Sequence, residues 1–422
     1  VPRRADVPDR PVRADGEEQA GQQLRGPAGL SGPLTVRVVH VSAYYAPAFS
    51  FGGPPRSIHG LCRALVEAGC DVEVLTTDAD GVDRLPAPVR ERREFEGVPV
   101  RYFARSRPFR IAGSRDLAAH LGPAVRHADV VHIHGLWNRV VWAAARSARA
   151  AGVPYVLSPR GMLDAGSLRH HRWRKTLVYP FADRPAVRNA AVLHATSSGE
   201  ADGIRRRCPS ARIEVIPNGI DPEPRGAGQT RESLGLPADG PLIVSVSRLH
   251  PVKRLDLLVD AFADVRQRHP DARLVIAGPD EQGLRPSLEA RAGAAAPAIV
   301  WMGQVDEDRR DGLLRHAAAF AMCSDSESFG LAALEAMRAG APVLVTDTCG
   351  WPSVAEAGAG LVVRQTRAAI AEGLSRLLAE PAARRLMGER GQALARQAFG
   401  WPAVAARFTA LYGSIPRSAG GR

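Results

Sequence analysis

From position 36 onward, short runs of β-branched and aliphatic residues alternate with longer amphipathic stretches. This alternation is typical of parallel β-sheets covered by α-helices, and it occurs as two series. In the first series the pattern predicts strands at 36–42, 71–77, 98–103, 130–134, 155–158, 192–196 and 212–216. In the second series it predicts strands at 242–246, 272–277, 299–302, 319–322, 343–346 and 360–363. The sequence therefore predicts an α/β protein with two domains, each built on a parallel sheet covered by helices.

The segment I-P-N-G-I-D-P-E-P concentrates prolines and turn formers between the two series. We place the domain boundary there, which gives domains at 34–218 and 219–397. A terminal amphipathic helix is expected at 398–415, followed by a tail at 416–422. Residues 1–33 are rich in Pro, Gly and Arg without apolar periodicity, so we expect a disordered extension rather than a signal peptide.

Composition narrows the class of protein. At 422 residues the chain is longer than one hydrophobic core usually supports. No apolar run approaches the length of a membrane-spanning helix. The five cysteines are scattered and lack C-x-x-C spacing, which argues against a disulfide framework and against a zinc site. We expect a protein of the reducing cytoplasm, with the inner face of the plasma membrane as a further location.

The positive charge is concentrated in one stretch. The net charge is +12, and residues 101–188 hold sixteen Arg and Lys against four Asp and Glu. Within it, 168–188 mixes cationic residues with aromatic ones, which fits contact with an anionic membrane and a lipid-linked acceptor. A solvated helix is the equal alternative. No nucleic-acid recognition motif accompanies the charge, so we expect no nucleic-acid partner.

The strongest chemical signal is C-S-D-S-E-S-F-G-L-A-A-L-E, which follows the strand at 319–322. Ligands bind at the carboxyl ends of strands in open parallel sheets. Gly330 permits a tight turn, so that its amide and that of Leu331 can face a phosphate from a helix N-terminus. Glu335, about 1.4 turns further along the helix, can accept hydrogen bonds from ribose hydroxyls. Glu327 precedes the helix, within reach of a sugar beyond the phosphates.

Carboxylates beside a diphosphate require cations. Arg248 and Lys253 follow the first strand of the second series, in S-R-L-H-P-V-K. On a strand-to-helix turn their charges can neutralise a departing diphosphate. Lys253 is one of only two lysines in an arginine-rich chain, which favours a role for a compact ammonium group over the alternative of a chance remnant.

The first series carries weaker signals. In F-G-G-P-P-R, Gly52 and Gly53 allow a loop to approach a ligand closely, and as structure alone they form a turn before a helix. His132 and His134 end a buried strand. We interpret His134, nearer the strand end, as the site residue, and His132 as a core residue on the opposite face. Two histidines at this spacing are poor support for a metal site.

Together these pieces resemble family 4 of the retaining glycosyltransferases, which have the GT-B fold. The similar features are Glu-x7-Glu, G-x-P-V, S-R-L-x-x-x-K, P-N-G-I-D and F-G-G-P-P-R. The resemblance implies two Rossmann-like, doubly wound domains facing across a cleft and a C-terminal helix that crosses back to the first domain. It also implies catalysis without a bound metal or other cofactor.

The resemblance also assigns roles. It implies that Glu335 binds the ribose, that Glu327 and His134 approach the transferred sugar, and that Arg248 and Lys253 hold the diphosphate. The turn formed by Phe329, Gly330 and Leu331 would bind phosphate, and the loop with Gly52 and Gly53 would cover the donor phosphates or the acceptor.

Two motifs differ from the usual pattern. S-P-R-G-M-L-D resembles a subgroup acting in exopolysaccharide or lipopolysaccharide assembly, which often has His where this chain has Arg160. We place Arg160 near the acceptor. In T-D-T-C-G-W-P, Cys349 and Trp351 stand where small or aliphatic residues are more usual.

These inferences lead to one functional expectation and two alternatives. We expect transfer of a hexose from a nucleoside diphosphate sugar to a hydroxyl acceptor, with retention of the anomeric configuration, in cell-surface polysaccharide, glycolipid or other glycoconjugate synthesis. A sugar-nucleotide epimerase of the same fold is one alternative. A non-catalytic protein that binds membrane or nucleic acid through 101–188 is the other.

Overall fold

The structure is a computed structural model that describes residues 35–49, 52–81, 83–86, 90–106, 112–163 and 183–416. The expected extension at 1–33 and nearly all of the expected tail, at 417–422, lie outside the described residues. Most of the aromatic and basic stretch lies outside them as well, at 164–182. From Val36 onward the chain forms one compact unit that contains two large sheets.

The first sheet has eight strands in the order β10-β9-β8-β7-β1-β2-β6-β5. The pairings are parallel except for β5 with β6. The strands are β1 (Arg37–Ser42), β2 (Asp71–Thr77), β5 (Arg92–Phe95), β6 (Val98–Phe103), β7 (Val130–His134), β8 (Tyr155–Ser158), β9 (Val192–Ala195) and β10 (Ile213–Val215). A separate two-stranded sheet pairs β3 (Ala79–Asp80) with β4 (Asp83–Arg84).

Helices cover both faces of this sheet, as the alternation of strands and amphipathic stretches predicts. They are α1 (Gly53–Glu67), α2 (Arg115–Arg126), α3 (Arg139–Ala150), α6 (Arg184–Arg188) and α7 (Ser198–Arg205). Apolar side chains of α1 pack in one core, and those of α2 and α3 pack in another. Side-chain caps fix two of the helix starts: Ser114 accepts a hydrogen bond from the Leu117 amide, and Asn138 accepts one from the Val141 amide.

The second sheet has six parallel strands in the order β13-β12-β11-β14-β15-β16. The strands are β11 (Leu242–Val246), β12 (Arg273–Ala277), β13 (Ile299–Gly303), β14 (Ala319–Met322), β15 (Val343–Thr346) and β16 (Gly360–Val363). Its α-helices are α8 (Leu255–Arg268), α9 (Arg285–Ala292), α10 (Glu307–Arg315), α11 (Leu331–Arg338), α12 (Pro352–Glu356), α13 (Arg367–Ala379) and α14 (Pro381–Phe399). Short 3-10 helices lie at η3 (Pro251–Lys253), η4 (Gly293–Ala298) and η5 (Asp347–Cys349).

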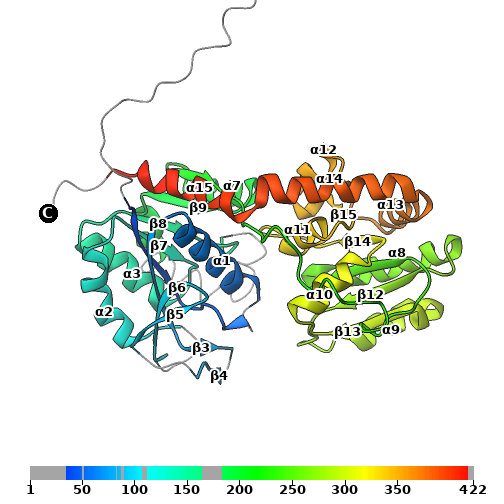
Figure 1. Cartoon of the computed structure of the whole chain (residues 1–422), viewed down its shortest axis with the longest axis horizontal. Coiled ribbons are helices and arrows are strands. Elements are labelled where there is room, and N and C mark those ends of the chain that lie inside the picture. The colour runs from blue at the N-terminus through cyan, green and yellow to red at the C-terminus, as the bar shows by residue number, and fades with distance from the viewer. Residues whose placement is uncertain are drawn as a thin grey trace, which may run out of the picture. The chain divides into compact units, whose positions relative to one another are not determined.

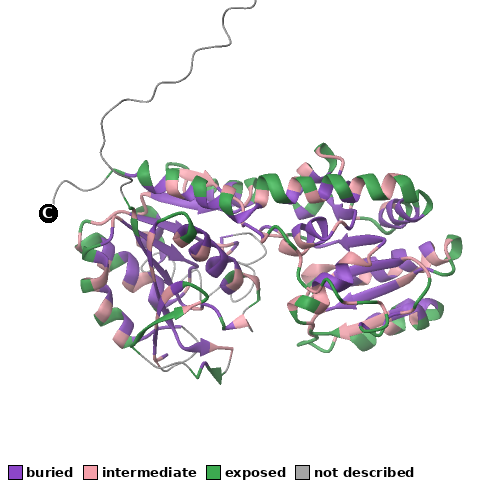
Figure 2. Cartoon of the chain, in the orientation of Figure 1, coloured by how far each residue is buried: buried purple, intermediate pink, exposed green. Residues whose placement is uncertain are grey.

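Central strands of both sheets are buried along their length, because helices cover both faces (Figure 2). We call the eight-stranded sheet with its helices the first lobe, and the six-stranded sheet with its helices the second lobe. Strand β7 reads V-V-H-I-H and all five residues are buried, so its two histidines lie inside the first lobe. The α/β class and the parallel sheets predicted from the sequence are confirmed.

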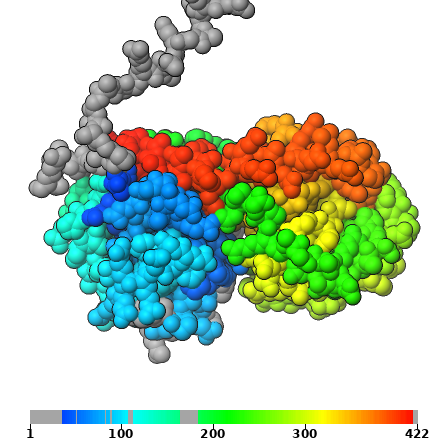
Figure 3. Space-filling model, in the orientation of Figure 1, coloured from blue at the N-terminus to red at the C-terminus, as the bar shows by residue number. Residues whose placement is uncertain are grey.

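The C-terminal helix α15 (Trp401–Gly413) belongs to the first lobe rather than the second. Its residues Val404, Phe408 and Tyr412 lie in the same core as α1, and Figure 1 shows α15 beside the first sheet while α14 lies over the second. The two helices form one continuous band in the space-filling view (Figure 3). The helix expected at 398–415 is α15, which begins at Trp401 because the backbone is extended at Gly400, and which ends at Gly413.

Candidate functional site

The turn between β14 and α11 has the geometry expected of a phosphate-binding turn. Gly330 adopts the left-handed conformation at φ 77° and is the N-cap of α11. No side chain caps this helix, and the first amides of a helix have no intrahelical acceptor. Phe329 is buried beneath the turn. The amides at the start of α11 are therefore available to an anion, and the helix dipole favours one there.

Lys253 and Glu327 meet beside this turn. The Lys253 ammonium lies 2.7 Å from Glu327 Oε1, and Ser324 Oγ donates a 2.6 Å hydrogen bond to the same oxygen. Helix η3 places Lys253 here because the Asp325 amide donates to the Val252 carbonyl at 2.8 Å, which joins η3 to the loop after β14. The structure thus brings together a cation and a carboxylate that lie 74 residues apart.

Arg248 differs from Lys253 in being exposed. Among the described residues, no carboxylate forms an ion pair with its guanidinium. Its backbone turn packs closely against Gly278, whose φ is 147°, and a Cβ at that glycine would overlap the Ser247 carbonyl. The turn that carries Arg248 is therefore fixed, while its charge remains available.

Glu335 lies on α11 and is held by a residue that the sequence analysis missed. Arg310, on α10, lies 3.0 Å from Glu335 Oε1 and also 3.0 Å from Asp311 Oδ1. Burial raises the pKa of Glu335, while Arg310 and then Arg338 act in the opposite direction. Arg310 stands in the sequence E-D-R-R-D, which carries no motif, so only the packing of α10 against α11 reveals its partner.

The same turn meets residues of the first lobe. A Cβ at Gly53 would lie 3.2 Å from Leu331 Cδ1, so the start of α1 touches the start of α11. The Ser328 carbonyl accepts a 2.8 Å hydrogen bond from Ser197 Oγ, at the start of α7. Gly52 is the exposed N-cap of α1 at φ 80°. Both glycines therefore lie on the side of the first lobe that faces the turn between β14 and α11.

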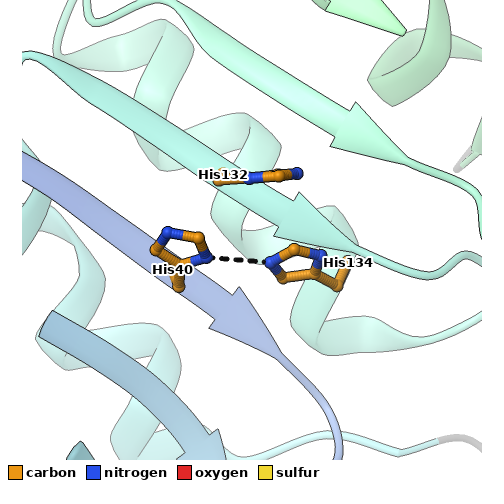
Figure 4. Close-up of side chains that lie close together, drawn as sticks. All are labelled: His40, His132 and His134. Atoms are coloured by element: carbon orange, nitrogen blue, oxygen red, sulfur yellow. Dashed lines mark hydrogen bonds between the residues drawn. The ribbon is translucent and has the colours of Figure 1, made fainter. Parts of the chain in front are cut away.

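Three buried imidazoles cluster inside the first lobe (Figure 4). The rings of His132 and His134 have centroids 4.1 Å apart, and His40 Nδ1 lies 3.0 Å from His134 Nε2. The expectation that His132 and His134 lie on opposite faces was wrong, because residues i and i+2 of a strand share a face. His40 joins them from β1, since His40 pairs with His132 across β1 and β7.

One hydrogen-bond chain through this region has a fixed direction. The Ile216 carbonyl can only accept, so His194 Nε2–H donates to it at 2.7 Å. A neutral His194 then accepts at Nδ1 from Ser158 Oγ, and Ser158 accepts from His132 Nε2–H, each at 2.7 Å. His132 Nδ1 therefore accepts from the Tyr412 hydroxyl, also at 2.7 Å. Burial lowers the pKa of both histidines, which keeps them neutral.

Arg160 sets the direction of the hydrogen bond between His134 and His40. Its backbone is left-handed at φ 53°, and its guanidinium donates to Ser57 Oγ at 3.0 Å and to Asn218 Oδ1 at 3.2 Å. It also donates to His134 Nδ1 at 3.3–3.4 Å, so His134 Nε2–H donates to His40 Nδ1. Burial lowers the pKa of Arg160 to about 10. Both ring nitrogens of His134 thus have protein partners.

The three imidazoles offer nitrogen atoms that could bind a metal ion, but the charges around them disfavour a cation. Binding a metal through His132 would break its bond to Tyr412 or to Ser158. The positive guanidinium of Arg160 also touches His134, and no carboxylate joins this cluster among the described residues. A hydrogen-bonded polar core fits these contacts better, so catalysis without metal stays our prediction.

No described helix is both long enough and apolar enough to cross a bilayer. The expected membrane contact of 168–188 falls largely on residues outside the structure's description.

Comparison with known proteins identifies the family. Residues 52–219 match the family described as glycosyl transferase 4-like domain, and residues 227–394 match glycosyl transferases group 1. A D-inositol 3-phosphate glycosyltransferase of Actinosynnema mirum is 30% identical over 413 residues, with 90% of this chain and 96% of that protein covered. One from Nocardiopsis dassonvillei is 32% identical, with 82% of this chain and 87% of that protein covered. This chain belongs to the GT4-type glycosyltransferases.

Solved structures show that this glycosyltransferase has the GT-B fold. Sucrose-phosphate synthase from Thermosynechococcus elongatus superposes with a TM-score of 0.70 at 21% identity, covering 90% of this chain and 99% of that one. HepE of Anabaena, in complex with UDP and glucose, gives a TM-score of 0.69 at 19% identity, covering 90% of this chain and all of that one. The family and fold implied by the sequence motifs are confirmed. The relatives compared above are named for D-inositol 3-phosphate rather than for polysaccharide assembly.

Proposed function

We propose that this glycosyltransferase transfers a hexose from a nucleoside diphosphate sugar to a hydroxyl group, with retention of the anomeric configuration. The observation that carries the proposal is the pairing of Lys253 with Glu327 beside the uncapped N-terminus of α11. The helix amides offer hydrogen bonds to a diphosphate, and Lys253 adds a positive charge next to them.

In the proposed reaction, the bond between the anomeric carbon and the diphosphate oxygen breaks while a bond to the acceptor oxygen forms on the same face. The departing diphosphate takes the acceptor proton. Lys253 and the exposed Arg248 stabilise the negative charge that develops on the leaving group. Lys253 and Ser324 hold Glu327 at Oε1, and we propose that its other carboxylate oxygen hydrogen-bonds the sugar.

Glu335 is proposed to bind the ribose. Arg310 holds Oε1, and none of the described residues hydrogen-bonds Oε2, which leaves that oxygen for ribose hydroxyls. Gly52 and Gly53 are proposed to approach the donor phosphates from the first lobe, since Gly53 already lies against Leu331. The HepE structures hold UDP, UDP with glucose, or UDP-glucose, so UDP-glucose is the first donor to test.

For the acceptor, we propose a polyol phosphate, supported by the relatives named for D-inositol 3-phosphate. The cationic stretch at 101–188 suits an anionic acceptor. The same charge also suits a lipid-linked acceptor of polysaccharide assembly, which is the second candidate. Assays with D-inositol 3-phosphate and with a lipid-linked diphosphate sugar separate the two, and product formation without any acceptor would instead favour an epimerase.

The test begins with the melting temperature of the full chain in a panel of UDP-, GDP- and ADP-sugars, because a ligand of the native state raises it. Activity is then compared for wild type, Lys253→Ala and Glu327→Gln. Both variants should lose about 10²-fold in kcat, on the scale of removing one group that stabilises transition-state charge. Arg367→Ala, which breaks an exposed pair with Asp264, is the control. Wild-type turnover in both variants would refute the assignment of this site.

A further inference from the structure

Trp351 contacts the phosphate-binding turn directly, although it comes from a different part of the second lobe. It follows η5 and precedes α12, in the T-D-T-C-G-W-P segment that differs from the usual family pattern. Its side chain is buried, and its indole Nε1–H donates a hydrogen bond to the Phe329 carbonyl. The indole ring also packs on Phe329, with centroids 5.2 Å apart, and on Phe399, at 5.5 Å.

This hydrogen bond fixes the orientation of a peptide group in the turn. In a trans peptide the carbonyl of one residue and the amide N–H of the next point in opposite directions. With the Phe329 carbonyl directed to the indole, the Gly330 N–H points away from it. That amide immediately precedes the free amides at the start of α11, and the hydrogen bond from Trp351 sets its direction.

The indole also occupies the space beside Gly330. A Cβ built on Gly330 would lie 2.7 Å from Trp351 Nε1 and 2.9 Å from Met322 Cε. Trp351 therefore lies against the backbone of the turn rather than at a distance behind other side chains. Burial of an indole N–H requires an acceptor, and the Phe329 carbonyl supplies it.

We infer that Trp351 is a positioning residue for the donor: its indole N–H fixes the Phe329–Gly330 peptide, and with it the direction in which the Gly330 amide faces the diphosphate. The inference rests on the proposed function of that turn. It assigns Trp351 no contact with substrate. Loss of the indole N–H frees the Phe329 peptide to rotate, which weakens donor binding without removing any donor-binding group.

The test compares full-length Trp351→Phe with wild type. Phenylalanine keeps an aromatic ring between Phe329 and Phe399 but cannot donate the hydrogen bond. Trp301→Phe is the matched control, because Trp301 lies on β13, where its ring contacts Arg285. The measurements are the Kd for UDP by calorimetry, KM and kcat for the donor, and the melting temperature.

In Trp351→Phe, we expect the Kd for UDP and the donor KM to rise roughly fivefold, the scale of one lost hydrogen bond. We expect kcat to stay within about twofold and the control to bind UDP as wild type does. A lower melting temperature with unchanged Kd and KM would overturn the inference and leave only a packing role. A wild-type chain that binds no nucleoside diphosphate would overturn the proposed function itself, and with it the positioning role.

If Trp351→Phe does not fold, the wild-type chain with ¹⁵N-labelled tryptophan provides a second measurement. The chain has six tryptophans, and Phe variants of the others assign the Trp351 indole signal by elimination. UDP should shift that signal and slow its hydrogen exchange, because the bound diphosphate holds the turn in place. A Trp351 signal that UDP leaves unchanged would overturn the inference.

Discussion

Replacing Ser158 with alanine tests the directed hydrogen-bond chain at its centre. The Ser158 hydroxyl accepts from His132 Nε2–H and donates to His194 Nδ1, each at 2.7 Å, and all three side chains are buried. Alanine leaves one buried donor and one buried acceptor without partners. A buried unsatisfied polar group costs about 1–3 kcal/mol, so the free energy of unfolding should fall by about 2–6 kcal/mol. That is a large share of the 5–15 kcal/mol typical of a domain.

The assay is urea unfolding near pH 7.5, followed by circular dichroism. Tyr412→Phe is the graded comparison, because it removes only the terminal donor and leaves one acceptor, His132 Nδ1, unpaired. We expect a loss of about 1–3 kcal/mol for Tyr412→Phe and a larger loss for Ser158→Ala. Ser287→Ala, at an exposed hydroxyl, is the control. A Ser158→Ala protein within about 0.5 kcal/mol of wild type, the range of an ordinary surface substitution, would refute the assigned chain.

Two further predictions concern buried ionisable side chains. Burial lowers the pKa of His40 and of His194 to about 3, below the value near 6.5 of the unfolded chain, so stability is lost as the pH falls through the window between these values. These two residues alone should lower the free energy of unfolding by about 2 kcal/mol between pH 6 and pH 5, measured by urea titration, and a flat profile would contradict their burial as neutral groups. Asp311→Ala should cost about 3–5 kcal/mol, because it leaves the buried Arg338 without its carboxylate, whereas Asp264→Ala at an exposed pair should have little effect on the melting temperature.

Periodicity predicted most of the fold because each parallel strand is buried on both faces and is a short apolar run. The strand at 71–77 is reproduced as β2, and the strand at 319–322 as β14. The edge strand β5 was missed because R-R-E-F has no apolar pattern, and its pairing depends on β6. The helix expected at 398–415 starts at Trp401, because the extended Gly400 separates it from α14.

The site could be predicted where local motifs carry it and not where packing assembles it. The sequence placed Lys253 and Glu327 at one site because each belongs to a motif at a strand end, and the structure brings the two side chains together. Arg310 and His40 were not, because each acts through a neighbouring element that only the folded chain brings close. Packing also decides whether a side chain has protein partners, which the sequence does not show. His134 is an example, because His40 and Arg160 contact its two ring nitrogens.

The crossing of α15 back to the first lobe has a consequence for synthesis of the chain. The first sheet is complete in sequence at β10, yet Val404, Phe408 and Tyr412 of its core are translated much later. At 5–20 residues per second, the ribosome needs roughly 10–40 seconds to add the intervening segment. During that interval the first lobe exposes the apolar surface that α15 will cover, and His132 lacks its tyrosine partner. The core of the first lobe can therefore close only after α15 has been synthesised.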